Sequence, residues 1–192
     1  MTVTPLILKR NKRKLIPSYG HCITIGSAHP SPGAMLMAEP STEKAFLDSY
    51  NIHDFDVPLC TVDMAIFTVQ EAQLKVLLVK RAQHPHRGKW ALPGGFIDQQ
   101  QDKTLEETAF RKLRQKTGVR SPYLEQVATI GGAKRDPRGW SLTVLYFALL
   151  SAEAITLAAD DASSEVAWVD FETAKTMRLA FDHQRLLQLS FD

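Results

Sequence analysis

The sequence has few cysteines, no long apolar run and almost no net charge. Its 192 residues include two cysteines, Cys22 and Cys60, which lie too far apart in sequence to form a metal-ligand motif. We therefore expect reduced thiols and a cytoplasmic location. No segment approaches the roughly 18 uninterrupted apolar residues that a membrane-spanning helix requires, so we expect no membrane partner. A net charge of +2 is too small to indicate that the whole chain binds nucleic acid.

Composition divides the chain into a leader and a domain. The apolar (44%) and charged (23%) fractions are those of an ordinary soluble protein. Near the N-terminus, basic side chains crowd Lys9–Lys14, and a loop rich in proline and glycine follows at His29–Met35. Such an arm is able to contact phosphates, or it is a solvated and partly disordered leader. We expect an N-terminal extension over residues 1–55 and one domain over residues 56–192.

Apolar runs predict several strands around a central helix. The expected strands cover residues 59–69, 74–81, 127–132, 141–150 and 165–171. The first two flank the polar QEAQ as a hairpin, and the DPRG sequence at 136–139 fits a type I turn. Residues 172–189 are expected to form one or two helices, with a break near Phe181. This order predicts an α/β fold with a mixed β-sheet sandwiched between α-helices.

The central helix is expected at residues 104–117. Thr104 and Glu107 have the spacing of a capping box, in which each side chain accepts a hydrogen bond from a first-turn amide. Gly118 follows the helix, where a left-handed residue is favoured. Side chains at a spacing of four form the face that we expect to be buried, namely Leu105, Ala109, Leu113 and Thr117.

Residues 94–119 resemble the signature of the Nudix family, whose members hydrolyse nucleoside diphosphates linked to another group. The helix of that signature reads Arg-Glu-apolar-x-Glu-Glu-x-Gly-apolar. The scaffold positions that match are Gly95, Arg111, Leu113, Gly118 and Val119. The stretches WALPGGFID and VLLVKR are also typical of the family. The resemblance covers about Leu59 to Leu189 and implies the Nudix fold.

The acidic positions of the signature are occupied by other residues. Where the family has glutamates that bind magnesium, this chain has Lys112, Gln115 and Lys116. The family also has a glutamate that pairs with the helix arginine. Counted from Gly95 that position is Gln101, and counted back from the helix it is Lys103, so we expect no carboxylate there.

These replacements oppose magnesium binding on physical grounds. Mg²⁺ requires anionic oxygen ligands, whereas two Glu-to-Lys changes and one Glu-to-Gln change alter the charge by about five units. We expect weak or absent pyrophosphatase activity, no assigned catalytic residue and no certain cofactor. The alternative is a Mg²⁺-dependent hydrolase, similar to an ADP-ribose pyrophosphatase, that uses other carboxylates. The candidates are Glu106, Glu107, Glu125 and Asp136.

Two further segments, RDPRGWSLTVLYFALL and LAFDHQRLL, resemble the Nudix-related transcriptional regulators of NAD metabolism. In that group a Nudix domain senses ADP-ribose or a related nucleotide, a following winged-helix domain binds DNA, and the assembly is a dimer. The resemblance implies an ADP-ribose-type ligand and a homodimer. The sequence ends at Asp192, so we expect DNA binding only through a missing C-terminal domain. Other readings are an interaction domain with an empty pocket and, from the basic arm, a DNA-binding fragment.

The expected ligand residues surround the glycine loop. Arg81 is expected to meet a phosphate, and Phe96 to form a wall of the pocket, while Arg138 and Trp140 are suited to hold adenine or ribose. Simple packing is the alternative for both Trp140 and Trp90. We expect His183 to form a hydrogen bond at a helix start instead of acting as a base. The full expected ligand-binding set is Arg81, Gly94, Gly95, Phe96, Arg111, Lys112, Lys116, Arg138 and Trp140.

Overall fold

The structure is a computed structural model that describes residues 42–117, 123–151, 157 and 162–191. The chain divides into two compact units, residues 1–50 and residues 51–192, and each is described by itself. The basic run Lys9–Lys14, the loop His29–Met35, Cys22 and Gly118 lie outside the described residues. In the part of the chain that is described, no helix is long and apolar enough to cross a membrane.

The described part of the first unit is the short helix α1 (Glu43–Ser49). The Thr42 hydroxyl accepts a hydrogen bond from the Ala45 amide at 3.1 Å and caps the helix. The rings of Phe46 and Tyr50 pack against each other with centroids 5.5 Å apart. In the second unit, the single-turn helix η1 (Ile52–Asp54) precedes the sheet.

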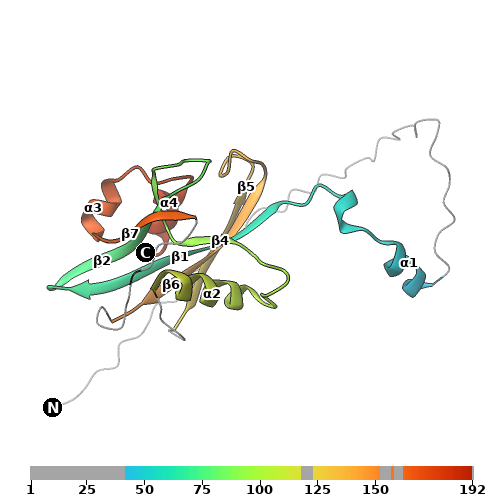
Figure 1. The fold of residues 1–192 in the computed structure, drawn as a ribbon, viewed down its shortest axis with the longest axis horizontal. Helices are drawn as coiled ribbons and strands as arrows, with labels where there is room; N and C mark the ends of the chain where they lie inside the picture. The colour runs from blue at the N-terminus through green and yellow to red at the C-terminus, as the bar shows by residue number, and fades with distance from the viewer. Residues whose placement is uncertain (1–41, 118–122, 152–156, 158–161, 192) are drawn as a thin grey trace, which may run out of the picture. The chain divides into compact units, whose positions relative to one another are not determined.

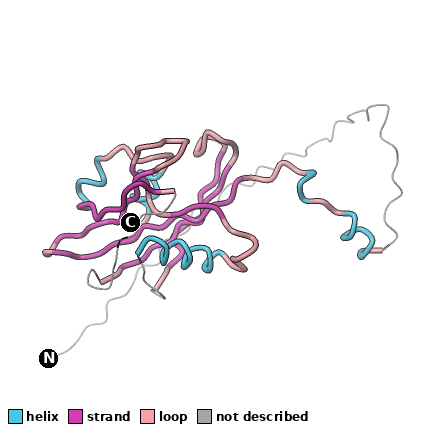
Figure 2. Tube along the Cα trace, in the orientation of Figure 1, coloured by secondary structure: helices cyan, strands magenta, loops and turns pink. Residues whose placement is uncertain are grey.

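A mixed sheet forms the centre of the second unit (Figures 1 and 2). The described strands are β1 (Leu59–Gln70), β2 (Gln73–Arg81), β3 (Trp90–Ala91), β4 (Gly94–Phe96), β5 (Glu125–Gly132), β6 (Ser141–Leu149) and β7 (Ser163–Asp170). β1 pairs in parallel with β6, whereas the other described pairings are antiparallel. The predicted hairpin of β1 and β2 is confirmed, with Glu71 and Ala72 both at positive φ in its two-residue turn.

The long strand β1 changes partner along its length, and this change opens the sheet. Residues Phe67–Gln70 pair with β2, whereas Thr61–Asp63 pair with β4. The far end of β2 pairs instead with β3. The strands β1 and β2 therefore separate after a few residues, and the short segments β3 and β4 occupy the space between them. Because of this separation, the glycine loop, which includes β4, lies within the sheet beside β1.

Helices cover both faces of the sheet (Figure 1), which confirms the predicted fold class. Helix α2 (Leu105–Thr117) packs Ala109 and Leu113 against Val62, Met64 and Ile66 of β1. On the opposite face, α3 (Phe171–Thr176) and α4 (His183–Leu189) contribute to a second cluster that includes Ala65 and Phe67. The alternation along β1 follows from the two-residue period of a strand. It also places Asp63 on the α4 face.

The predicted start of α2 is confirmed. The Thr104 hydroxyl accepts from the Glu107 amide at 3.2 Å, and the Glu107 carboxylate accepts from the Lys103 amide at 2.6 Å. In an ideal capping box, Glu107 would accept from the amide of Thr104 itself. Here it accepts from the amide of the preceding residue, Lys103. The predicted break in the C-terminal helical segment is also present, because α3 ends at Thr176 and α4 begins at His183. Phe181, between them, has a φ of 52°.

Burial of one face of α2 predicts a large effect for a truncation there. Leu113 is fully buried, whereas Gln115 on the same helix is exposed. Replacing Leu113→Ala should lower the free energy of unfolding by about 2–5 kcal/mol, because it leaves a cavity between helix and sheet. The matched change Gln115→Ala should alter it by less than about 0.5 kcal/mol. Urea denaturation of the two variants measures both values, and equal losses would contradict the packing described for α2.

Candidate functional site

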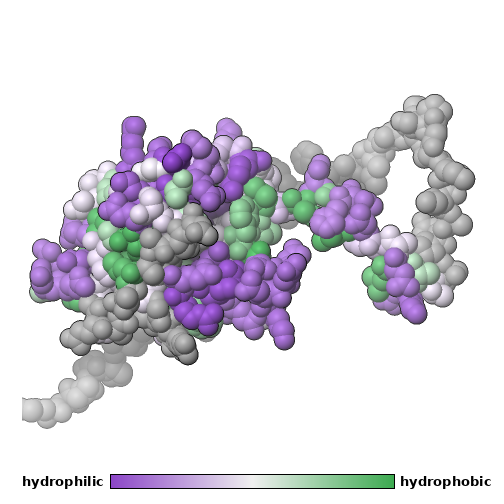
Figure 3. Space-filling model, in the orientation of Figure 1, coloured by the Kyte–Doolittle hydropathy of each residue, from purple (hydrophilic) through white to green (hydrophobic). Residues whose placement is uncertain are grey.

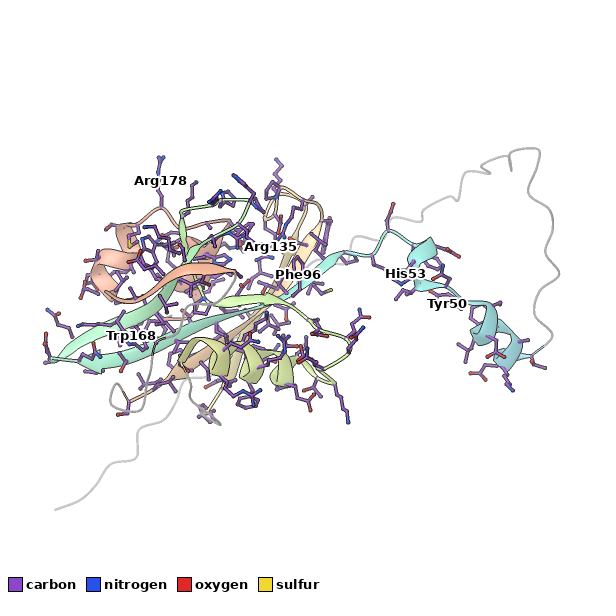
Figure 4. All side chains as sticks on the ribbon, viewed as in Figure 1. Tyr50, His53, Phe96, Arg135, Trp168 and Arg178 are labelled. Atoms are coloured by element: carbon purple, nitrogen blue, oxygen red, sulfur yellow. The ribbon has the colours of Figure 1, made fainter. Side chains whose placement is uncertain are left out.

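A cleft of about 280 Å³ lies where β1 and β2 separate. Its walls come from β2, β4, α2, the turn between β5 and β6, and the segment before α4. Figure 4 labels Phe96 and Arg135, which line it, and shows Arg178 projecting away from the domain. Its described lining residues include Arg81, Gly94, Gly95, Phe96, Lys112, Arg135, Asp136, Arg138, Phe181 and His183.

Two arginines lie close to one phenyl ring in this cleft. The guanidinium carbon of Arg81 lies 4.7 Å from the centroid of Phe181, and that of Arg138 lies 5.9 Å from the same centroid. Arg138 also lies 4.9 Å from the ring of Phe96. Aromatic faces attract cations, so the rings hold positive charges close together. Burial and the nearby Arg138 both lower the pKa of Arg81.

The turn that carries Arg138 is fixed by Asp136. The carboxylate of Asp136 accepts from Arg138 Nε at 3.0 Å, from its Nη2 at 2.7 Å and from its backbone amide at 2.9 Å. The Gly139 amide donates to the Asp136 carbonyl at 3.3 Å, which confirms the predicted turn. Burial acts to raise the pKa of Asp136, but the hydrogen bonds from Arg138 outweigh it and the pKa is lowered. Asp136 is therefore an ion-pair partner in this structure.

A second ion-pair group forms the floor of the cleft. Arg135 donates to both carboxylate oxygens of Asp182, from Nε at 3.1 Å and Nη2 at 3.0 Å, and its Nη2 lies 3.7 Å from Asp63. His183 begins α4, and its Nδ1 accepts from the Leu92 amide at 2.9 Å. Burial lowers the pKa of His183, so its ring is neutral at pH 7. The expected role of His183 as a hydrogen-bonding residue at a helix start is confirmed.

The glycines of β4 allow close contact with their neighbours. A Cβ atom on Gly94 would lie 2.3 Å from both the Asp63 carboxylate and the Val62 carbonyl, so a side chain is excluded there. Gly95 has a φ of 149°, and a Cβ on it would lie 3.2 Å from the Cε and Nζ atoms of Lys112. The end of the Lys112 side chain therefore lies against the backbone of β4, inside the cleft wall.

The helix arginine has a carboxylate partner, contrary to our expectation. Asp102 accepts from Arg111 through both oxygens, with Nε at 2.7 Å, and also from the Thr108 hydroxyl at 2.9 Å. The Asp98–Asp102 turn places Asp102 inward and leaves Gln101 and Lys103 exposed. The prediction of a missing carboxylate was wrong because counting from the glycine and from the helix gave the residues on either side of Asp102.

The structure brings together part of the expected ligand set. Arg81, Gly94, Gly95, Phe96, Lys112 and Arg138 line the cleft. Arg111 instead lines a neighbouring hollow, and Trp140 is half exposed with its ring against Gly131. Gln115 is exposed on α2, and the side chain of Lys116 lies outside the described residues. Phe181 and Arg135 were missed, although they lie within the LAFDH and RDPRG stretches singled out in the sequence.

The donor groups of the cleft do not fit a magnesium ion. The described residues contain no group of three histidine, cysteine or acidic side chains that could hold a metal. Lys112 presents an ammonium group where the family has a carboxylate, and an ammonium group has no lone pair to donate. Of the alternative acids, Glu107 accepts from the Lys103 amide, while Glu106 and Glu125 are exposed and do not line the cleft. We derive no metal-dependent step from these residues.

The Asp102–Arg111 pair predicts a pH-dependent contribution to stability. The hydrogen bonds from Arg111 hold the pKa of Asp102 well below its ordinary value of about 3.9. The stabilisation is therefore complete above the unfolded-state pKa and is lost as the pH falls through the lower native pKa. At pH 7, Asp102→Asn should reduce the free energy of unfolding by roughly 3–5 kcal/mol, because it leaves Arg111 without its anionic partner.

The matched control for this prediction is Glu165→Gln, which breaks the exposed ion pair with Lys80. We expect a change of about 0–1 kcal/mol for the control. Urea denaturation at a series of pH values measures both variants. A difference between wild type and Asp102→Asn that stays constant down to pH 2 would contradict the assignment.

Comparison with known proteins places the chain among characterised relatives. It is 54% identical over 151 residues to the ADPR responsive transcriptional repressor NtrR of Acinetobacter baylyi, covering 79% of this chain and 60% of that protein. It is 30% identical over 125 residues to the ADP-ribose pyrophosphatase of Methanocaldococcus jannaschii, covering 65% of this chain and 70% of that protein. The chain thus spans less than two thirds of the Acinetobacter protein.

A solved structure agrees in sequence and in fold. The Nudix domain of Shewanella oneidensis NrtR, crystallised with ADP ribose, superposes with a TM-score of 0.73 at 46% identity, covering 78% of this chain and 97% of that chain. The Nudix domain family matches residues 61–189, from the first half of β1 to the end of α4. With the mixed sheet, the glycine loop and the Arg111 helix in place, the chain belongs to the Nudix family.

Proposed function

We propose that this domain binds ADP-ribose or a related nucleotide as the sensing part of a regulator of NAD metabolism, with weak or absent pyrophosphatase activity. The observation that carries the proposal is the cleft, which is lined by arginines and by a lysine at a signature position that holds glutamate in hydrolases. The relatives support it, since one is named as ADPR responsive and another was crystallised with ADP ribose.

The chemistry of the cleft suits a nucleotide diphosphate. Arg81 and Arg138 both place guanidinium groups close to the ring of Phe181, and guanidinium groups bind phosphate oxygens through paired hydrogen bonds. The Nε of Arg81 donates a hydrogen bond to the Pro85 carbonyl at 2.8 Å. The guanidinium group is thus oriented by a neutral acceptor in this bond, not by a carboxylate. The rings of Phe96 and Phe181 offer apolar surfaces for a base or a ribose.

The proposal extends to partners of the whole protein. DNA binding is proposed for the whole protein, because the relative from Acinetobacter is named as a transcriptional repressor. A homodimer and a cytoplasmic location belong to the same proposal. The function of the Nudix domain in this proposal is to respond to the nucleotide.

The second candidate is a hydrolase that uses other carboxylates. The relative from Methanocaldococcus, named as an ADP-ribose pyrophosphatase, favours it. In the described residues, however, Glu106, Glu107 and Glu125 do not line the cleft. The carboxylate that does line the cleft, Asp136, is engaged by Arg138.

A paired measurement tests the two candidates. ADP-ribose at about 100 times its dissociation constant should raise the melting temperature by roughly 5–10 °C, because ligand binding stabilises the native state by about 2.7 kcal/mol. The same samples, with and without Mg²⁺, are assayed for AMP. Stabilisation without AMP supports the sensor. Metal-dependent AMP release at enzyme-like rates would replace it with the hydrolase.

A substitution in the cleft tests the phosphate assignment. Arg81→Gln should weaken ADP-ribose binding by about tenfold or more, since a charge-assisted hydrogen bond to phosphate contributes about 1.5–3 kcal/mol. Arg178→Gln is the matched control, because Arg178 is exposed and projects away from the domain (Figure 4). Isothermal titration measures both affinities. Equal affinities for the two variants would remove Arg81 from the binding site.

A further inference from the structure

Lys112 lies at the boundary between two hollows of the surface. It lines the cleft together with Gly94, Gly95 and Phe96, and it also lines the neighbouring hollow beside Arg111. Its Cε and Nζ atoms are each 3.2 Å from the point where a Cβ on Gly95 would stand. The absence of that Cβ is what lets the end of the side chain lie on β4. The ammonium group of Lys112, a residue of α2, therefore lies beside the glycine loop.

The cleft therefore brings together cationic groups from different elements. Arg81 belongs to β2 and Arg138 to the turn between β5 and β6, while Lys112 comes from α2. Arg138 is paired with Asp136, and Arg135 with Asp182, so these carboxylates offset two of the charges. Arg81 donates Nε to a backbone carbonyl. The described lining of the cleft holds four cationic side chains and one carboxylate, that of Asp136, and this composition favours an anionic occupant.

We propose that Lys112 supplies the positive charge for which Nudix hydrolases use a divalent metal, and that the cleft binds its diphosphate without any metal ion. The lysine contacts phosphate oxygens directly, together with Arg81. This inference rests on the proposed nucleotide-binding function and deepens it. It follows from the disagreement between the magnesium requirement of the family and the ammonium group of Lys112.

The mechanism differs from metal binding in a measurable way. A lysine holds a phosphate as a point charge and requires no free cation in solution. A metal-bridged ligand, in contrast, dissociates when the metal is chelated. Binding to this cleft should therefore be insensitive to EDTA and sensitive to the charge at position 112.

The experiment is isothermal titration of the full 192-residue chain with two probes, ADP-ribose and inorganic pyrophosphate. Each probe is titrated in EDTA and again in Mg²⁺. The variants are Lys112→Gln, which removes the charge, and Arg114→Gln, which removes a charge from the exposed side of the same helix. In EDTA, wild type and Arg114→Gln should bind equally, and Lys112→Gln should bind about tenfold more weakly or worse. Circular dichroism establishes that both variants are folded.

The outcomes separate this inference from the proposed function. Wild-type binding of ADP-ribose that requires Mg²⁺ would overturn the inference and leave the nucleotide sensor standing. Equal affinities for Lys112→Gln and Arg114→Gln would also overturn it. Metal-free binding of pyrophosphate that depends on Lys112, without binding of ADP-ribose, would support the inference and overturn the proposed ligand. If neither probe binds under any condition, both proposals fail.

Discussion

The ion pair between Arg135 and Asp182, with Asp63 beside it, is the interaction on which the cleft depends. Asp63 belongs to β1, Arg135 follows β5, and Asp182 immediately precedes α4. The guanidinium therefore joins the central strand, the turn that carries Arg138 and the start of the last described helix. The side chain of Arg135 is 8% exposed, so the pair is shielded from water and removal of one partner would leave a buried charge.

Two adjacent residues in the middle of the Nudix helix serve different purposes. Arg111 forms an ion pair with Asp102 that holds the preceding loop against α2. One residue later, Lys112 turns toward the glycine loop. The outward face of α2 carries hydrophilic side chains (Figure 3), while Ala109 and Leu113 pack against the sheet. The helix thus retains the structural half of its signature, although the residues for metal binding have been replaced.

Much of this architecture follows from local sequence patterns. The hairpin of β1 and β2, the spacing of four along α2 and the DPRG turn each have a local physical cause, and each was predicted. The exchange of partners along β1 was not predicted, because it depends on where β3 and β4 return to the sheet. That exchange creates the cleft. No pattern within β1 or β2 indicates it.

The residues of the candidate site also divide into those that the sequence predicted and those that it did not. Arg81, Phe96 and Lys112 were found because they flank a motif with a known geometry. Asp102 was missed because its loop has an unusual length, and only the fold shows which side chain turns inward. Arg135 and Phe181 were missed because their roles arise from contacts between segments more than forty residues apart, such as the Arg135–Asp182 bond with its sequence separation of 47.

The Arg135–Asp182 pair also has a consequence for helix α4. Asp182 occupies the N-cap position, where an aspartate normally accepts hydrogen bonds from the first amides of a helix, yet it makes no such bond here. Both of its oxygens are held by Arg135. The amides of His183 and Arg185 donate instead to the backbone carbonyls of Ala180 and Asp182. The position at which this helix begins is consequently tied to a residue of the cleft floor.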